Sequence, residues 1–226
     1  MRKQTQLLSV LAMLILLFPL FNSLAIAAQP KLEGLSPDFI MKGSFKGGVT
    51  TLKGDFLITW EDYTISGALG EINRDDKGNF ISLKVTLQPR VVEQGDNPLE
   101  LVCDSLDMHE TNERITATGN VLITTKELKV NANHLEGGRP AGIADIIKAA
   151  LHSFSLEVQN DVNEWLAAAA PTDQIFLLQG TVAGNTSEIR FDGDFLLVNA
   201  TTENFVFAGP ANITYISQED EGTDNE

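Results

Sequence analysis

Apolar and polar side chains alternate along most of the chain, in short segments separated by turn residues. Clear examples lie at 56–60, at 81–87 and at 115–123, where every second position is apolar or small. A period of two is typical of strands with one buried face, and turn chemistry at this spacing indicates antiparallel neighbours. Several such strands predict a mainly β fold, either a sandwich, a jellyroll or a barrel.

A different period holds between residues 140 and 170. Apolar residues recur there at steps of three and four, and polar residues fill much of the remainder. This pattern predicts one long amphipathic helix over about 141–169, with Pro140 in its first turn and Pro171 after its end. The polar face holds more Asp and Glu than Lys and Arg, unlike a lipid-surface helix. We therefore expect its apolar face to close one end or side of the sheets.

The N-terminus has the order of a secretory signal peptide. Arg2 and Lys3 precede an apolar run over 7–24, and a small-x-small pattern follows at 25–27. This order predicts a signal peptide over 1–27, cleaved after Ala27, and therefore an exported protein. The apolar run is slightly long, so the alternative is an uncleaved anchor in the inner membrane formed by residues 7–24.

The remainder of the chain divides by composition. Residues 28–44 are rich in Pro and Gly and predict an irregular lead-in, whereas 45–217 hold the alternating segments of a single β domain. The last nine residues, 218–226, hold five carboxylates and no apolar side chain, which predicts a disordered acidic tail.

Charge and motifs exclude several classes of function. Of 226 residues, 16 are Lys or Arg and 31 are Asp or Glu, giving a net charge of −15. Such acidity argues against a nucleic-acid partner, because affinity for phosphate backbones comes largely from basic side chains. The single cysteine, Cys103, alternates with Leu99 and Leu101, which predicts a buried apolar role. The three histidines are far apart and no nucleophile motif occurs, so we predict no enzyme, no catalytic residue, no metal and no cofactor.

Two parts of the chain are similar to each other. The run Lys53-Gly54-Asp55-Phe56-Leu57-Ile58 is similar to Asp192-Gly193-Asp194-Phe195-Leu196-Leu197, and Gly-x-Val steps recur at 119–121 and 180–182. One interpretation is that a β-meander reuses glycine turns. The other is a repeated two-strand unit stacked along one axis.

A family resemblance rests on one of these segments. Ile115-Thr116-Ala117-Thr118-Gly119-Asn120-Val121-Leu122-Ile123, followed by Leu128-Lys129-Val130-Asn131-Ala132-Asn133, resembles the repeat of the OstA-like (LptA-like) lipopolysaccharide-transport proteins. The resemblance extends more weakly over 45–72 and 176–216, and it does not include the helix. It implies an antiparallel β-jellyroll of two sheets, into which the predicted long amphipathic helix would be inserted. It also implies a periplasmic protein of outer-membrane envelope assembly, which shields the acyl chains of lipopolysaccharide or another lipid in a hydrophobic groove.

The same resemblance implies partners. An open jellyroll has unpaired edge strands, through which envelope transport proteins or further copies would associate. The alternative functions are a structural or protein-interaction β-sandwich of the cell envelope without a lipid ligand, and, third, a periplasmic enzyme whose site is not evident.

We expect the groove to be lined by the inward-facing stripes of the strands. For each residue the alternative is ordinary core packing, which a two-layer sheet requires in any case. The predicted lipid-binding residues are Phe56, Ile58, Trp60, Ile65, Ile115, Val121, Ile123, Leu128, Val130, Phe191, Phe195, Phe205 and Phe207.

Overall fold

The computed structural model describes residues 30–44, 47–60, 63–94, 98–110, 113–126, 128–187, 189–202 and 204–216. The predicted signal peptide and the predicted acidic tail lie outside these ranges. Within them, no helix has both the length and the apolar character that crossing a membrane requires.

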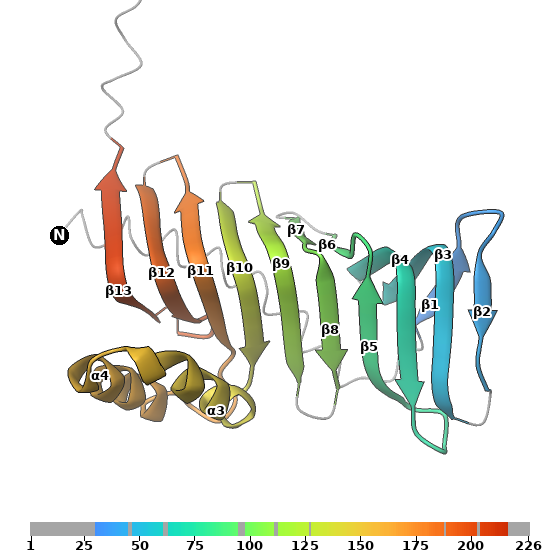
Figure 1. Ribbon diagram of the computed structural model, residues 1–226, viewed down its shortest axis with the longest axis horizontal. Coiled ribbons are helices and arrows are strands. Elements are labelled where there is room, and N and C mark those ends of the chain that lie inside the picture. The colour runs from blue at the N-terminus through green and yellow to red at the C-terminus, as the bar shows by residue number, and fades with distance from the viewer. Residues whose placement is uncertain are drawn as a thin grey trace, which may run out of the picture.

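Thirteen antiparallel strands form one continuous sheet that folds back on itself in the described part of the chain. Figure 1 shows the longer strands side by side almost in chain order, from β2 at one end to β13 at the other, with β6 and β7 behind this row. The strands are β1 (Lys31–Gly34), β2 (Ile40–Lys42), β3 (Gly48–Trp60), β4 (Tyr63–Arg74), β5 (Phe80–Thr86), β6 (Arg90–Glu93), β7 (Leu99–Val102), β8 (Ser105–His109), β9 (Arg114–Thr124), β10 (Lys129–Gly138), β11 (Ile175–Asn185), β12 (Ile189–Asn199) and β13 (Asn204–Tyr215).

The long strands belong to two layers, because each changes its pairing partner or its register near its middle. The first part of β4 pairs with β6, whereas its second part pairs with β5. In the same way β9 pairs first with β8 and then with β7. We name the two layers sheet A (β2-β3-β4-β5-β8-β9-β10-β11-β12-β13) and sheet B (β1-β3-β4-β6-β7-β9-β10-β11-β12-β13).

Left-handed backbone marks the bend on alternate long strands. Gly54 in β3, Gly119 in β9, Gly180 in β11 and Gly209 in β13 have φ values of 87°, 72°, 69° and 88°. Glycine adopts this conformation without the Cβ clash that other residues suffer. The register shifts occur at the same places, which is the geometry of a β-bulge. The Gly-x-Val steps at 119–121 and 180–182 therefore mark bends of the long strands.

The bend also changes which side chains face inward. In β9, Ala117 and Val121 both belong to the core between the sheets, four positions apart, so alternation continues through the bend. In β10, the corresponding residues are Ala132 and Leu135, three positions apart, so alternation shifts by one position. Strands that contain the extra bulge residue keep the alternation of inward and outward side chains through the bend. In their partner strands the alternation shifts by one residue.

The insertion between β10 and β11 is helical, as predicted, but it is divided. It consists of α3 (Pro140–Ala150), a short 3-10 turn (Leu151–Ser153) and α4 (Leu156–Ala167). The single long helix that we expected over 141–169 is interrupted because Phe154 is extended and Ser155 caps a new helix by accepting a hydrogen bond from the Val158 amide.

Two hydrophobic clusters stabilise the fold. The larger lies between sheets A and B and includes residues of every long strand from β3 to β12. The smaller lies on the outer face of sheet A, where Ile143, Ile147 and Leu151 pack with the outward residues of β11 and β12. The helices therefore cover a side of one sheet, below β10 to β13 in Figure 1.

The predicted fold class is confirmed: the chain is mainly β and antiparallel, with a helical insertion. One detail differs at the N-terminal end. The lead-in that we expected to be irregular contains β1 and β2, which pair with the second and first parts of β3.

Candidate functional site

The interior face of sheet B carries one continuous row of side chains across the molecule. Cross-strand partners share a face of an antiparallel sheet, so the pairing register defines the row directly. From the first strand to the last it reads Leu32, Ile58, Ile65, Val91, Leu101, Ile123, Val130, Gly184, Phe191 and Ile213.

Sheet A has a matching row on its interior face. Its members are Met41, Leu52, Gly70, Val85, Leu106, Ala117, Leu135, Leu178, Leu196 and Phe207. Neither row contains a polar side chain. The space between the sheets is therefore apolar from one edge of the molecule to the other along both rows.

Large side chains fill the space above small ones in this interior. A Cβ placed on Gly70 would lie 2.8 Å from the Phe56 ring, and one on Gly184 would lie 2.2 Å from the Phe191 ring. A Cβ on Gly137 would likewise lie 2.6 Å from the Phe176 ring. These glycines are needed for close approach, so the interior along β4, β10 and β11 is packed with protein side chains.

The interior differs in exposure between its middle and its last strand. Leu101 and Ile123, in the middle of the sheet B row, are 0% and 1% exposed. At the end of that row Ile213 is 41% exposed, and Tyr215 on the same face is 50% exposed. The interior is thus closed along the central strands and reaches solvent at β13.

The structure places all but one of the predicted lipid-binding residues on the interior side. Phe205 and Phe207 are half-buried against the core cluster, and the others are buried within it. Phe195 instead belongs to the outer cluster, where its ring meets that of Phe154 at a centroid distance of 5.5 Å. The expectation for Phe195 ignored the shift of alternation at the bend of β12, where Gly193 and Leu196 face inward.

Among the buried polar residues on the interior side, a carboxylate and an amide did not enter the sequence prediction. Glu93 lies one strand-period after Val91 and is 9% exposed. Gln174 directly precedes β11, on the side of Phe176, and is 1% exposed. The alternation of inward and outward residues in β6 is enough to place Glu93 on the interior side. Placing Gln174 requires knowing the residue at which β11 begins.

A buried carboxylate is held on the outer face of sheet A. Glu136 of β10 accepts hydrogen bonds from Arg114 at 2.9 and 3.1 Å and from the Thr116 hydroxyl at 2.9 Å, and His134 Nε2 lies 3.1 Å away. Burial raises the pKa of Glu136, but the contacts with His134, Arg114 and Thr116 outweigh it, so the pKa is lowered. This group stabilises the sheet beside the helices.

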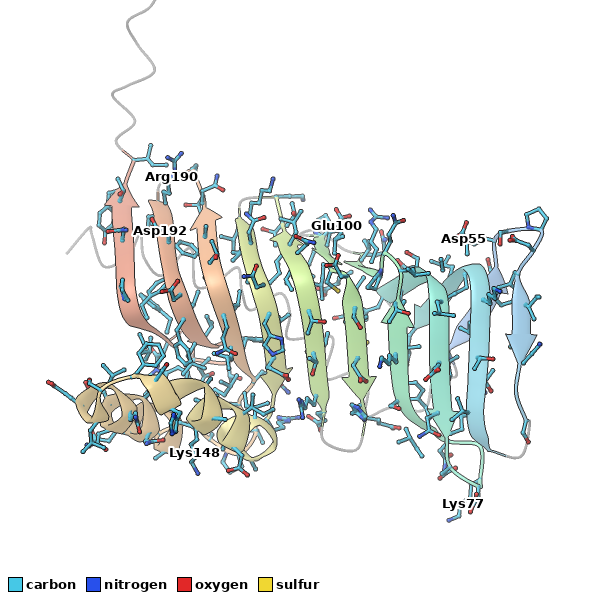
Figure 2. The ribbon with its side chains drawn as sticks, in the orientation of Figure 1. Asp55, Lys77, Glu100, Lys148, Arg190 and Asp192 are labelled. Carbon is cyan, nitrogen blue, oxygen red and sulfur yellow. The ribbon has the colours of Figure 1, made fainter. Side chains whose placement is uncertain are left out.

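Other candidate chemistry is structural. Burial raises the pKa of the Cys103 thiol to about 12, which keeps it protonated and unreactive, in agreement with the predicted apolar role. No group of three or more potential metal ligands occurs in the described residues. The charged residues labelled in Figure 2, including Lys77, Lys148 and Arg190, lie on the outside of the molecule.

Comparisons with known proteins give a limited result. No protein-family model matches the chain, and no curated protein matches it. Among solved structures, it is similar to LptH of Pseudomonas aeruginosa, described as the LptA-homologous periplasmic component of a lipopolysaccharide transport device. The similarity has a TM-score of 0.42 at 11% identity and covers 48% of this chain and 74% of that chain. A similarity of this size does not show membership of the family.

Proposed function

We propose that the protein is exported to the periplasm and binds a lipid, of the lipopolysaccharide type or another, with its acyl chains between sheets A and B. One observation carries this proposal: the two interior rows are apolar throughout and emerge at β13, where Ile213 and Tyr215 are exposed. Burying each methylene of an acyl chain in such a space contributes about 0.8 kcal/mol.

The C-terminal edge is the entry that this proposal uses. Phe205 and Phe207 of sheet A are half-buried there, and Ile213 of sheet B is on the opposing interior face. Phe191 and Phe207 make an edge-to-face contact at 5.7 Å. An acyl chain that enters between these side chains contacts apolar groups on both sides, and it need not displace the packed central interior.

A substitution at the exposed end of the row tests the proposal without disturbing the core. We expect the mature protein to bind a fluorescent fatty acid or lipopolysaccharide saturably. Ile213→Asp should weaken that binding at least tenfold, because it places a charge at the entry. The neighbouring Thr214→Asp, on the outer face of the same strand, is the matched control and should leave binding unchanged. Absence of saturable binding by the folded wild-type protein would contradict the proposal.

A second candidate function is a protein-interaction sandwich of the envelope, because apolar side chains are also exposed at the opposite edge. Ile40 and Met41 of β2 are 47% and 50% exposed, and in the described residues β2 has β3 as its one partner. Unpaired strand edges add further strands through backbone hydrogen bonds. Sedimentation velocity should show concentration-dependent association that Met41→Lys weakens. Association without any lipid binding would favour this second function.

A further inference from the structure

Gln174 is the most unusual polar residue of the interior. Its side chain is 1% exposed, and neither its Nε2 nor its Oε1 has a hydrogen-bond partner among the described residues. A buried amide without partners destabilises the fold, and nearly all buried polar groups in folded proteins are paired. Among the described residues, no group supplies the partner that this amide requires.

The backbone fixes the direction of this side chain. The Gln174 amide donates to the Thr201 hydroxyl at 3.0 Å, and its carbonyl accepts from the Ala200 amide at 2.8 Å. Ala200 is buried in the cluster between the sheets, and so is Phe176, two positions along from Gln174. Alternation therefore directs the Gln174 side chain to the interior side of sheet A. Asp173 lies on the other side, where it accepts a hydrogen bond from Asn199.

Gln174 belongs to a polar rim of sheet A. Gly138 is the last residue of β10 and pairs with Ile175, the first residue of β11, so Arg139 and Gln174 are the residues just outside the paired ends of the two strands. Arg139 donates to Glu113 and to the Thr172 carbonyl, and its side chain is 26% exposed. Further into the interior of sheet A, β10 and β11 contribute Leu135, Gly137, Phe176 and Leu178. The polar groups thus gather at the rim and the apolar groups behind it.

This arrangement matches an amphiphile. We propose that the Gln174 amide recognises a hydroxyl or amide group attached close to the acyl chain of the lipid, a specificity that rests on the proposed lipid-binding function. Such a group both donates and accepts, so it satisfies Nε2 and Oε1 together. An unsubstituted hydrocarbon chain leaves both atoms unsatisfied. The site therefore selects hydroxylated or amide-bearing acyl lipids over plain ones.

Matched fatty acids test this selectivity. Binding of myristic acid and of a series of monohydroxylated myristic acids is measured by isothermal titration calorimetry on the mature protein. We expect the hydroxymyristic acid whose hydroxyl is best placed to bind about tenfold more tightly than myristic acid. This is the factor that one buried hydrogen bond between neutral groups provides. Gln174→Leu should remove this preference by weakening the hydroxylated ligand while retaining myristic acid. Gln179→Leu, on the outer side of the same strand, should keep the preference.

The other outcomes are distinct. If wild-type protein binds both kinds of fatty acid equally, or if Gln174→Leu keeps the preference, the Gln174 inference is overturned and the proposed function stands. Equal binding together with a higher melting temperature of Gln174→Leu would show that a buried water alone serves Gln174. If neither fatty acid nor lipopolysaccharide binds, the proposed function fails, and the inference fails with it.

Discussion

The central strands and the C-terminal strands of this molecule differ in which of their faces are buried. Strands β5, β8 and β9 have a closed interior face and a polar outer face. Strands β11 and β12 are buried on both faces in sheet A, because α3 and α4 cover their outer side. The next strand, β13, has a partly open interior face. The comparison indicates that the helices supply the packing that the interior loses where it opens.

The largest expected effect lies in the closed region. Phe56 is fully buried, and its ring fills the space over Gly70. Phe56→Ala should lower the free energy of unfolding by about 3–5 kcal/mol through lost transfer energy and the cavity left behind. Chemical denaturation measures it, and Leu57→Ala on the opposite face of β3 is the control. A loss below 1 kcal/mol would show that this interior is not tightly packed.

A smaller and more local effect is expected under the helices. Ile147 is fully buried between α3 and sheet A, so Ile147→Ala should cost about 2–4 kcal/mol. In the Ile147→Ala variant, native-state hydrogen exchange should accelerate more, relative to wild type, in β11 to β13 than in β5 to β9, because the C-terminal strands depend on this cluster. Lys148→Ala, at an exposed position, should change neither the free energy of unfolding nor the exchange rates. Equal acceleration in both regions would remove the distinction between them.

The bends allow a stabilising change. Asn120 in β9 and Thr181 in β11 follow the bend glycines with φ values of 48° and 53°. Asn tolerates this left-handed conformation, whereas a β-branched side chain is strained there. Thr181→Asn should therefore raise the free energy of unfolding by about 1 kcal/mol. Thr214 in β13 is not among the residues with positive φ, so the control Thr214→Asn should not raise the free energy of unfolding. A destabilised Thr181→Asn variant would contradict this account of the bend.

The smallest effect concerns pH at the boundary between the two regions. The pKa of Glu136 is lowered in the folded protein, so its contribution to stability is present above its unfolded pKa. That contribution is lost as the pH falls below about 4.3, the ordinary Glu pKa, and through the lower folded pKa. Thermal unfolding between pH 6 and pH 3 should show a shallower decline for Glu136→Gln than for wild type, with the exposed Glu71→Gln as control. Identical slopes for wild type and Glu136→Gln would contradict the role of this ion pair.

The sequence was sufficient for the fold class and for most of the interior. Alternation identified the inward residues of β3, β9 and β10, and the three- and four-residue spacing identified the helical insertion. These patterns did not predict the features that depend on tertiary geometry. The break at Phe154 depends on a local cap at Ser155. The position of Phe195 depends on a phase shift at a bend, which a count along one strand does not reveal.

The candidate site was less predictable for the same reason. Inward-facing residues of a closed core and of an opening edge have the same pattern, so Ile123 and Ile213 differ only in the structure, at 1% and 41% exposure. Gln174 precedes a strand whose start was not defined by the sequence. Its importance comes from the absence of partners for a buried amide, which is a property of the packed structure.

The most direct measurement of the central claim is a photo-crosslinking map with a diazirine-labelled fatty acid. Peptide mass spectrometry of the irradiated complex should locate adducts on the interior residues of β11 to β13, including Phe207 and Ile213, and excess unlabelled lipid should suppress them. Adducts confined to α4 or to the outer faces of the sheets, or no adducts that lipid competes away, would contradict the placement of an acyl chain between the sheets.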